Sequence, residues 1–202
     1  MQEVARLADA IVLDSIRGNN TVTRSLGDVL NEVKQEIGAA RASYPTLGPT
    51  RDGLAPAKER PGKQAVKYKL VVPGTVFYNP MRILIGSIAF VDDDDVPGIT
   101  SPDYVALQGK FDTMDSRWFY HWLRSPLGVH CILSLARGAV RERMLFNRLA
   151  EGKVELPDLS VQTKTSTALK ELKPLRMGIE RKLHEIEQLP QRLLAQAFGD
   201  AA

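Results

Sequence analysis

The sequence predicts an α+β fold in which a mixed, β-rich domain with short helices precedes a long C-terminal coiled-coil helix. Apolar residues recur at helical spacing over residues 3–17 and again over residues 116–136. Between these helices, residues 68–108 contain several segments rich in β-branched and aromatic side chains. Beyond residue 160 no strand-like run occurs, and leucines recur every three or four positions. This order divides the chain into residues 1–19, 20–157 and 158–202.

Composition and charge place the chain among ordinary soluble proteins. Of 202 residues, 27 are Lys or Arg and 24 are Asp or Glu, which leaves a net charge of +3, and 44% are hydrophobic. These values exclude disordered and collagen-like chains. No apolar run approaches the roughly 18 to 20 residues that a membrane crossing needs, and the acidic residues Glu3 and Asp9 do not fit a signal peptide. The single cysteine, Cys131, cannot form an internal disulfide, so a cytoplasmic protein without a membrane segment is expected.

The elements of the first two parts follow from hydrophobic period and turn signals. Residues 3–17 predict an amphipathic helix, which we expect to lie against helices of a partner. Residues 25–37 begin as a helix, but their second half fits a helix or a strand. Residues 39–63 are dense in Gly, Pro and charge, which is typical of a long irregular segment with a functional role. Strands are expected at residues 68–72, 75–78, 83–91 and 104–108, and helices at residues 116–124 and 126–136.

Residues 158–202 predict one long helix with an apolar seam. Asp158 or Ser160 could cap its start, and at about 1.5 Å per residue it would extend on the order of 55 to 60 Å, too far for this domain to cover. Pro174 and Pro190 fall inside it and are expected to bend it. The alternative is two or three ordinary bundle helices. The seam that would pair with a second copy of the chain consists of Leu169, Leu172, Leu175, Ile179, Leu183, Ile186, Leu189 and Leu193.

Charge is unevenly distributed along the middle of the chain. Residues 51–90 hold seven basic and two acidic residues, and residues 117–153 hold the same numbers. Between them, residues 92–115 contain seven aspartates and one lysine. A concentrated basic surface is typical of a nucleic-acid-binding protein. Basic side chains that only solvate loops would produce the same counts, so both interpretations stay open.

No combination of residues indicates a catalytic or metal site. Asp103, Glu151 and Lys153 fit the short pattern of a metal-dependent nuclease only across segments separated by two predicted helices. Residues 92–95 are four consecutive aspartates that cannot all face one ion, so a solvated loop is favoured over a cation site. No glycine loop for S-adenosylmethionine follows a predicted strand.

A series of short motifs runs in a fixed order over residues 25–200. The segments are residues 26–29, 44–48 with Gly53, 68–74, 77–82, 86–89, 98–104, 138–141, 156–159 with Gln162, and 193–200. No single motif is specific, but their order resembles one half of the specificity (S) subunit of type I restriction-modification systems. The chain departs from that family in having one recognition domain and one spacer helix instead of two of each, and in having Asp158 where a second proline is common. A natural half-length subunit, an excised fragment and a truncated gene product all stay open.

The resemblance implies a target recognition domain at residues 20–157 that binds double-stranded DNA, followed by a dimerisation or spacer helix at residues 158–202. It implies a subunit without catalytic activity and without a cofactor of its own. S-adenosylmethionine is expected on a partner methyltransferase subunit, which this chain would target, and a translocating endonuclease subunit is a further expected partner. Two copies paired through the helix would each read one half of a bipartite site.

Basic residues of the long irregular segment and of the turn after Gly138 are the expected DNA contacts. Arginine is the commonest reader of guanine because its guanidinium donates to both O6 and N7. The residues nominated to bind phosphates or base edges are Lys58, Arg60, Lys63, Arg82, Arg137, Arg141 and Arg143. The alternative function is a coiled-coil adaptor without DNA specificity, in which the aspartate cluster contacts another protein. An autonomous nuclease is the third.

Overall fold

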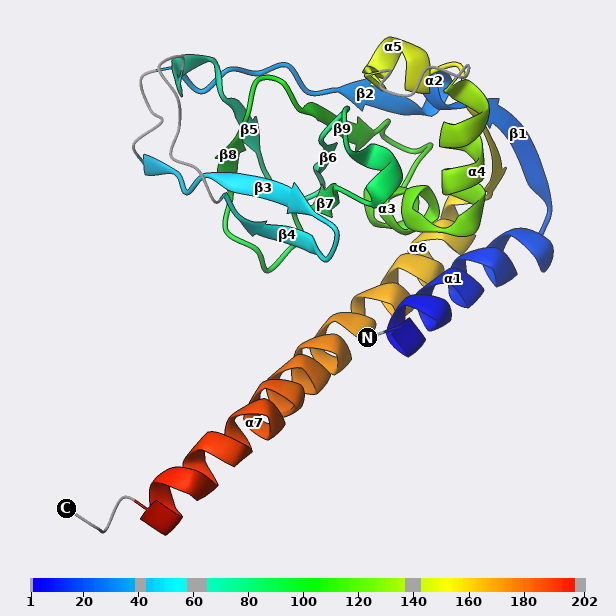
Figure 1. Ribbon diagram of the computed structural model, residues 1–202. Helices are drawn as coiled ribbons and strands as arrows, with labels where there is room; N and C mark the ends of the chain where they lie inside the picture. The colour runs from blue at the N-terminus through cyan, green and yellow to red at the C-terminus, as the bar shows by residue number, and fades with distance from the viewer. Residues whose placement is uncertain (1, 39–42, 58–64, 137–142, 199–202) are drawn as a thin grey trace.

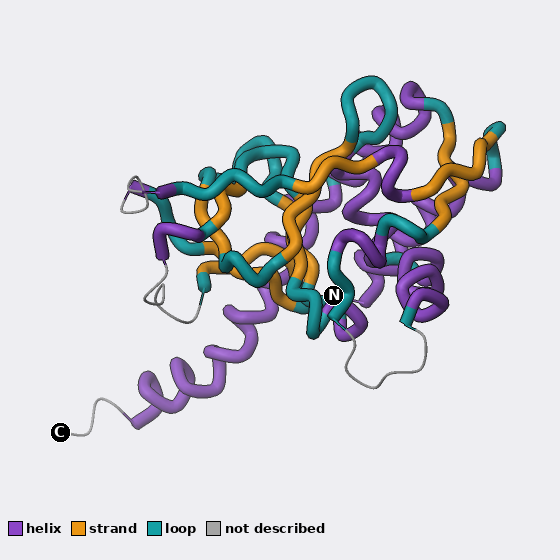
Figure 2. The backbone as a smooth tube through the Cα atoms, turned by 90° about the horizontal axis from the view of Figure 1, so that it is seen from above, coloured by secondary structure: helices purple, strands orange, loops and turns teal. Residues whose placement is uncertain are grey.

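The computed structural model describes residues 2–38, 43–57, 65–136 and 143–198. It consists of a domain with a β-rich and a helical part, from which one long helix extends (Figure 1). Figure 2 shows from above that this helix continues well past the strands. The mixture of sheets, short helices and a long C-terminal helix confirms the predicted α+β class. None of the described helices is long and apolar enough to cross a membrane.

A four-stranded antiparallel sheet forms the centre of the domain. Its strands lie in the order β2 (Leu30–Glu32), β9 (Val105–Gly109), β6 (Val76–Tyr78) and β7 (Ile88–Phe90). Side chains of a strand alternate between the two faces of its sheet. All three residues of β6 are buried because both faces are covered: Val76 and Tyr78 belong to the main core and Phe77 to a second, smaller core.

Helices cover the face of the sheet that carries the main core. α3 (Ser116–Arg124) contributes the fully buried Trp118 and Phe119, and α4 (Pro126–Leu135) follows directly. Asp115 caps α3, because its carboxylate accepts the N–H of Trp118 at 2.8 Å. Both helices are confirmed as the sequence predicted them. The short helices α2 (Leu26–Val29) and α5 (Phe146–Leu149) complete this layer.

Two small antiparallel pairs cover the other face, around the second core. They are β3 (Leu47–Thr50) with β4 (Gly53–Pro56), and β5 (Lys69–Val71) with β8 (Gly98–Thr100). The first pair lies inside residues 39–63, so the prediction that this whole segment is irregular is wrong. Gly and Pro in these strands disfavour the strand state locally, whereas burial of Leu47 against Gly98 stabilises it. A Cβ at Gly98 would lie 2.5 Å from the Leu47 side chain.

The segment predicted as one strand at residues 83–91 is divided. Its first part is the 3₁₀ helix η3 (Ile83–Ile85), and only its second part is the strand β7. Gly86 separates them with φ +83°, a conformation that costs glycine little. A second 3₁₀ helix, η2 (Ala65–Lys67), precedes β5. The strands expected at residues 68–72, 75–78 and 104–108 are confirmed as β5, β6 and β9.

A two-stranded ribbon joins the two ends of the domain. β1 (Thr21–Ser25) pairs antiparallel with β10 (Lys153–Pro157), so that Thr21 lies opposite Pro157. The sequence analysis predicted neither strand. β1 contains a single apolar residue, and the polar–apolar alternation of β10 covers only five residues. Thr21 and Thr23 instead donate hydrogen bonds to the carboxylate of Glu155 across the ribbon.

The N-terminal helix α1 (Gln2–Arg17) packs against α6 and α3 of its own chain. Val12 is fully buried there, and the indole N–H of Trp118 donates to the Ser15 hydroxyl at 3.0 Å. Part of its apolar face is thus covered within the chain, whereas Leu7 remains 45% exposed, so contact with helices of a partner stays a prediction.

The long C-terminal helix is built from α6 (Leu159–Lys170) and α7 (Leu172–Phe198), with a break at Glu171. Pro174 explains the break. In a continuous helix its ring would clash with the carbonyl of Lys170, and proline has no backbone N–H to donate to that carbonyl. Proline is tolerated in the first turn of a new helix, where N–H groups have no partner in any case. Pro190 lies inside α7.

Candidate nucleic-acid interface

The tight connection between β6 and β7, residues 79–86, presents a rigid exposed surface and is named here the β6–β7 turn. The carbonyl of Asn79 accepts the N–H of Arg82 at 2.9 Å. The carbonyl of Arg82 in turn accepts the N–H groups of Ile85 at 3.2 Å and Ser87 at 3.1 Å. These bonds hold the turn in one defined shape.

Ile83 of the β6–β7 turn points inward, whereas three other large apolar side chains of the turn remain exposed to solvent. Ile83 is only 4% exposed and belongs to the main core, so it anchors the turn. Met81, Leu84 and Ile85 are 53%, 47% and 67% exposed. The turn therefore carries aliphatic side chains on its outer surface.

Two of the nominated arginines lie at this turn. The N–H of Met144 donates to the carbonyl of Pro80 at 3.1 Å. This bond places the neighbouring Arg143 close to the start of the β6–β7 turn, which contains Arg82. Arg143 contacts the carboxylate of Asp103 at 3.5 Å, an exposed pair that contributes little to stability. Arg82 is exposed and has no ion-pair partner in the described part of the chain. The other nominated residues, Lys58, Arg60, Lys63, Arg137 and Arg141, lie outside the described residues.

Arg51 extends the same surface and was missed by the sequence analysis. It lies at the exposed tip of the β3–β4 hairpin, and a Cβ placed on Gly86 would be 3.7 Å from its Cγ atom. Arg124 fixes this arrangement, because its guanidinium donates to the carbonyls of Arg51 at 2.6 Å and Gly86 at 3.3 Å. The Asp52-Gly53 dipeptide, a common hairpin turn, was the signal that could have located Arg51.

Several other basic side chains serve the fold of the chain itself. Arg148 donates two hydrogen bonds to the carbonyl of Leu135 and so covers the C-terminus of α4. Arg176 on α7 donates to the carbonyl of Asp52 at 2.7 Å and ties the hairpin to the helix. The basic counts of the sequence therefore overstate the surface available to nucleic acid.

The acidic loop (residues 92–95) is also engaged internally. Its ion pairs are Arg117 with Asp92 and, at 2.8 Å, with Asp93; Lys170 with Asp93 at 2.9 Å; and Lys173 with Asp94 at 2.7 Å and Asp95 at 2.9 Å. The lysines come from the last residue of α6 and the second residue of α7. The loop thus fixes the α6–α7 junction to the domain.

Charge attraction shifts the titration of these groups. Hydrogen bonds from Lys170 and then from Arg117 lower the pKa of Asp93, and a hydrogen bond from Lys173 lowers the pKa of Asp94. Asp93 raises the pKa of Lys170 by the same attraction. The predicted solvated loop is thus corrected to an ion-paired one. In the described residues, no group of three or more His, Cys, Asp or Glu side chains is placed to hold a metal.

A buried glutamine fixes the start of α6. Gln162 is fully buried, and its side-chain N–H groups donate to the carbonyls of Pro157 at 2.8 Å and Thr113 at 3.1 Å. Its side-chain oxygen accepts the N–H of Asp115 at 2.9 Å, and the Ser166 hydroxyl hydrogen-bonds to the Asp115 carboxylate. Asp158, at the N-cap position, makes no side-chain capping bond.

The predicted dimerisation seam divides into a covered and an uncovered part. Leu169 is 2% exposed and Leu172 packs against the main core, so both belong to the interior of this chain. Ile179 is half-buried. The exposed members are Leu175, Leu183, Ile186, Leu189 and Leu193, at 46–60% exposure, and Met177 and Leu194 are exposed beside them.

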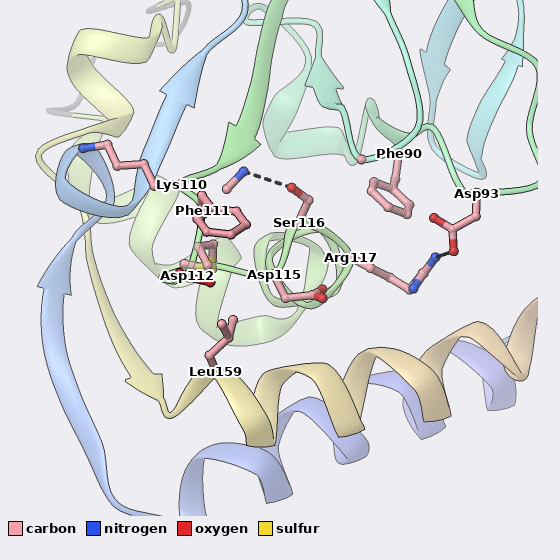
Figure 3. Close-up of a pocket in the computed structure, with 12 residues that line it drawn as sticks. Phe90, Asp93, Lys110, Phe111, Asp112, Asp115, Ser116, Arg117 and Leu159 are labelled. Carbon is pink, nitrogen blue, oxygen red and sulfur yellow. Dashed lines mark hydrogen bonds and ion pairs between the residues drawn. The ribbon is translucent and has the colours of Figure 1, made fainter.

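A pocket of about 380 Å³ lies between α3 and the start of α6 (Figure 3). Phe111, which is 90% exposed, stands at its edge, and Leu159 points toward it from α6. Two of its carboxylates are engaged, since Asp115 caps α3 and Asp93 pairs with Arg117, whereas Asp112 is exposed to solvent.

The residues of the nuclease pattern are not assembled into a site. Asp103 contacts Arg143. Glu151 contacts Arg148 at 3.4 Å, whereas Lys153 lies exposed on β10. This arrangement does not support a metal-dependent nuclease.

No protein-family model and no curated protein matches this sequence. Among solved structures, the type I restriction-modification S subunit from M. genitalium matches with a TM-score of 0.63 at 13% identity, over 96% of this chain and 53% of that one. A chain from a structural study of complex assembly and conformational transition of the type I restriction-modification system matches with a TM-score of 0.55 at 15% identity, over 95% of this chain and 52% of that one. The chain spans about half the length of these proteins. It therefore has the fold of one half of a type I S subunit, as the motif order predicted.

Proposed function

We propose that this chain is a sequence-specific DNA recognition subunit that reads one half of a bipartite site and targets a partner methyltransferase of a type I restriction-modification system. The observation that carries the proposal is the likeness to an S subunit over 96% of the chain, which includes the domain and the long helix together. An accidental likeness of a small β-rich domain would not extend along that helix.

The surface around the β6–β7 turn supports DNA binding. Arg51, Arg82 and Arg143 are exposed there, and Arg124 holds the hairpin and the turn in a fixed relation. Guanidinium groups on a rigid support bind phosphates and guanine edges with little loss of conformational freedom. The chain would contact DNA with this surface and dock the methyltransferase elsewhere.

The exposed seam of α7 supports a homodimer. Two chains paired through antiparallel helices would place two identical domains about a two-fold axis, and a two-fold protein reads a two-fold site. The target would then be two inverted copies of one short sequence, separated by a gap that the helix length sets.

The chain itself would neither methylate nor cleave DNA. S-adenosylmethionine would bind to the methyltransferase subunit, and an endonuclease subunit would join the complex for restriction in the cytoplasm. Sequencing the methylated bases in cells that express this chain with and without its methyltransferase tests the proposal. We expect an inverted, gapped motif with both proteins and none with this chain alone. Methylation by the isolated chain, or an unchanged methylome with both, would contradict it.

The exposed seam alone would also suit a coiled-coil adaptor that binds no DNA. Salt separates the two functions. DNA binding that releases counterions weakens steeply as salt rises, with a slope of about −0.9 per phosphate contact, whereas a mostly apolar protein contact does not. A binding titration between about 50 and 200 mM salt therefore decides between them.

A further inference from the structure

We propose that the aliphatic side chains of the β6–β7 turn, Met81, Leu84 and Ile85, read thymine by contacting its 5-methyl group in the major groove. The inference rests on the proposed function and assigns base-specific contacts to residues that charge alone would not nominate. It predicts at least one thymine in the half-site, at a position where the methyl group contributes to affinity.

These three side chains are exposed and lie close together in the sequence. Met81, Leu84 and Ile85 lie within five positions of one another and are each about half exposed or more. Single exposed apolar residues are common on protein surfaces, but a group of them indicates a contact. Ile83, in the same turn, is only 4% exposed, so the turn directs one apolar side chain to the core and these three to solvent.

The β6–β7 turn is rigid. The turn is held by its own hydrogen bonds, and the Ser87 hydroxyl donates to the carbonyl of Pro49 at 2.8 Å. Arg124 ties Gly86 and Ile88 to the β3–β4 hairpin. A preorganised surface loses little freedom on binding, which favours a reading contact over a solvated loop.

The arginines around the β6–β7 turn indicate which kind of ligand its surface suits. Arg51 and Arg143 flank the turn, and Arg82 lies within it; all three are exposed. Arg51 and Arg82 have no ion-pair partner among the residues that the structure describes. An apolar centre between arginines suits a ligand with anionic groups beside methyl groups. The major groove provides both, as phosphates at its edges and the thymine methyl group on its floor.

The test uses a half-site selected from a randomised duplex library with the full-length chain. Each thymine of the selected site is then replaced by uracil, which differs only by the missing methyl group. For the wild-type chain we expect about a fourfold loss of affinity at one or more positions, the effect of one methyl-sized group leaving an apolar contact.

The protein side of the test compares Met81→Ala, Leu84→Ala and Ile85→Ala with a matched control. Val96 is 68% exposed, close to the 67% of Ile85, but lies beyond the acidic loop, so Val96→Ala is the control. In at least one of the three turn variants the thymine and uracil duplexes should bind equally, whereas Val96→Ala should keep the wild-type ratio. All four positions are exposed, and thermal denaturation checks that the variants are folded.

The outcomes separate this inference from the proposed function. A selected site without thymine, equal binding of thymine and uracil by the wild-type chain, or full discrimination by all three turn variants overturns the inference and leaves the proposed function standing. Weaker assembly with the methyltransferase at unchanged DNA discrimination would make the turn a protein contact, and also overturns it. Absence of any sequence preference in the wild-type selection overturns both.

Discussion

The two loops at the ends of β7 use their polar side chains in opposite ways. The acidic loop after β7 directs its four aspartates to Arg117, Lys170 and Lys173 of the same chain. The β6–β7 turn before it leaves Arg82 exposed and presents aliphatic side chains to solvent. The acidic loop therefore stabilises the fold, whereas the turn is available to a ligand.

A run of charged residues in a sequence therefore does not predict whether the side chains are paired within the chain or exposed to a ligand. The aspartates are the most concentrated charge in the chain, yet their partners are internal. The arginines of the candidate interface are scattered, yet they share one surface. The distal part of α7 resembles the β6–β7 turn in that its apolar side chains are also exposed to solvent.

The largest expected effect comes from the uncovered seam. Replacing Leu183 and Ile186 by Asp should convert a dimer into monomers, because each carboxylate would have to lose water in an apolar interface. Sedimentation at micromolar concentration measures the change. Asp at Gln188 and Gln191, which helical spacing places on the opposite side of α7, adds the same charge and should leave the dimer intact. A wild-type monomer with a helical tail would refute the seam.

Breaking the acidic loop should have the next largest effect, on stability. Arg117 and Asp92 have side chains only 12% and 10% exposed, so Arg117→Ala leaves a buried carboxylate without its partner. We expect a loss of roughly 3 kcal/mol in the free energy of unfolding, measured by urea denaturation. An unchanged urea midpoint would mean that the pair contributes nothing to the fold.

Replacing an arginine of the β6–β7 turn by alanine should affect DNA binding and leave the stability nearly unchanged, the opposite of Arg117→Ala. Arg82→Ala removes an exposed side chain, so the free energy of unfolding should change by less than about 0.5 kcal/mol. DNA binding should weaken, and if Arg82 contacts a phosphate the slope of log affinity against log salt should fall by about 1. Arg82→Ala that binds DNA like the wild type would remove this residue from the interface.

The smallest effect is expected at the half-buried lysines of the acidic loop's ion pairs, Lys170 and Lys173. Replacing both by Ala should lower the melting temperature slightly, whereas Ala at Lys164, an exposed lysine of α6, should not. Because the pKa of Asp93 lies below its ordinary 3.8, this difference should be fully present above that pH and disappear as the pH falls further.

The lysines set the upper limit of the same window. The pKa of Lys170 lies above its ordinary 10.5, so the contribution is complete below that pH and is lost only as the pH rises through the raised value. Melting curves of the variant and the wild type from acid to neutral pH measure the lower limit. A difference that persists after the pH has fallen through the lowered pKa of Asp93 would show that the lysines act through packing.

Strong local patterns made much of the fold predictable. Helices α3 and α4 have caps and apolar faces within a few residues of sequence, and β6 is a continuous apolar run between turn signals. The strands β1, β8 and β10 depend on pairing with distant segments, whereas β3 and β4 form a local hairpin whose Gly and Pro residues weaken the strand signal. Of the candidate interface, Arg82 and Arg143 were nominated from charge, but Arg51 and the aliphatic side chains were not.

By itself the sequence determined the α+β class, the apolar seam and an order of motifs that matches half of an S subunit. Only the tertiary structure decided which charges remain available. Asp93 and Lys170 are 77 positions apart, and Asp94 and Lys173 are 79 apart, yet they form hydrogen bonds. Coulomb attraction depends on distance in space and on burial, neither of which a linear count contains. For that reason the same composition could have produced an exposed acidic patch. In this structure the aspartates instead form ion pairs that hold the α6–α7 junction to the domain.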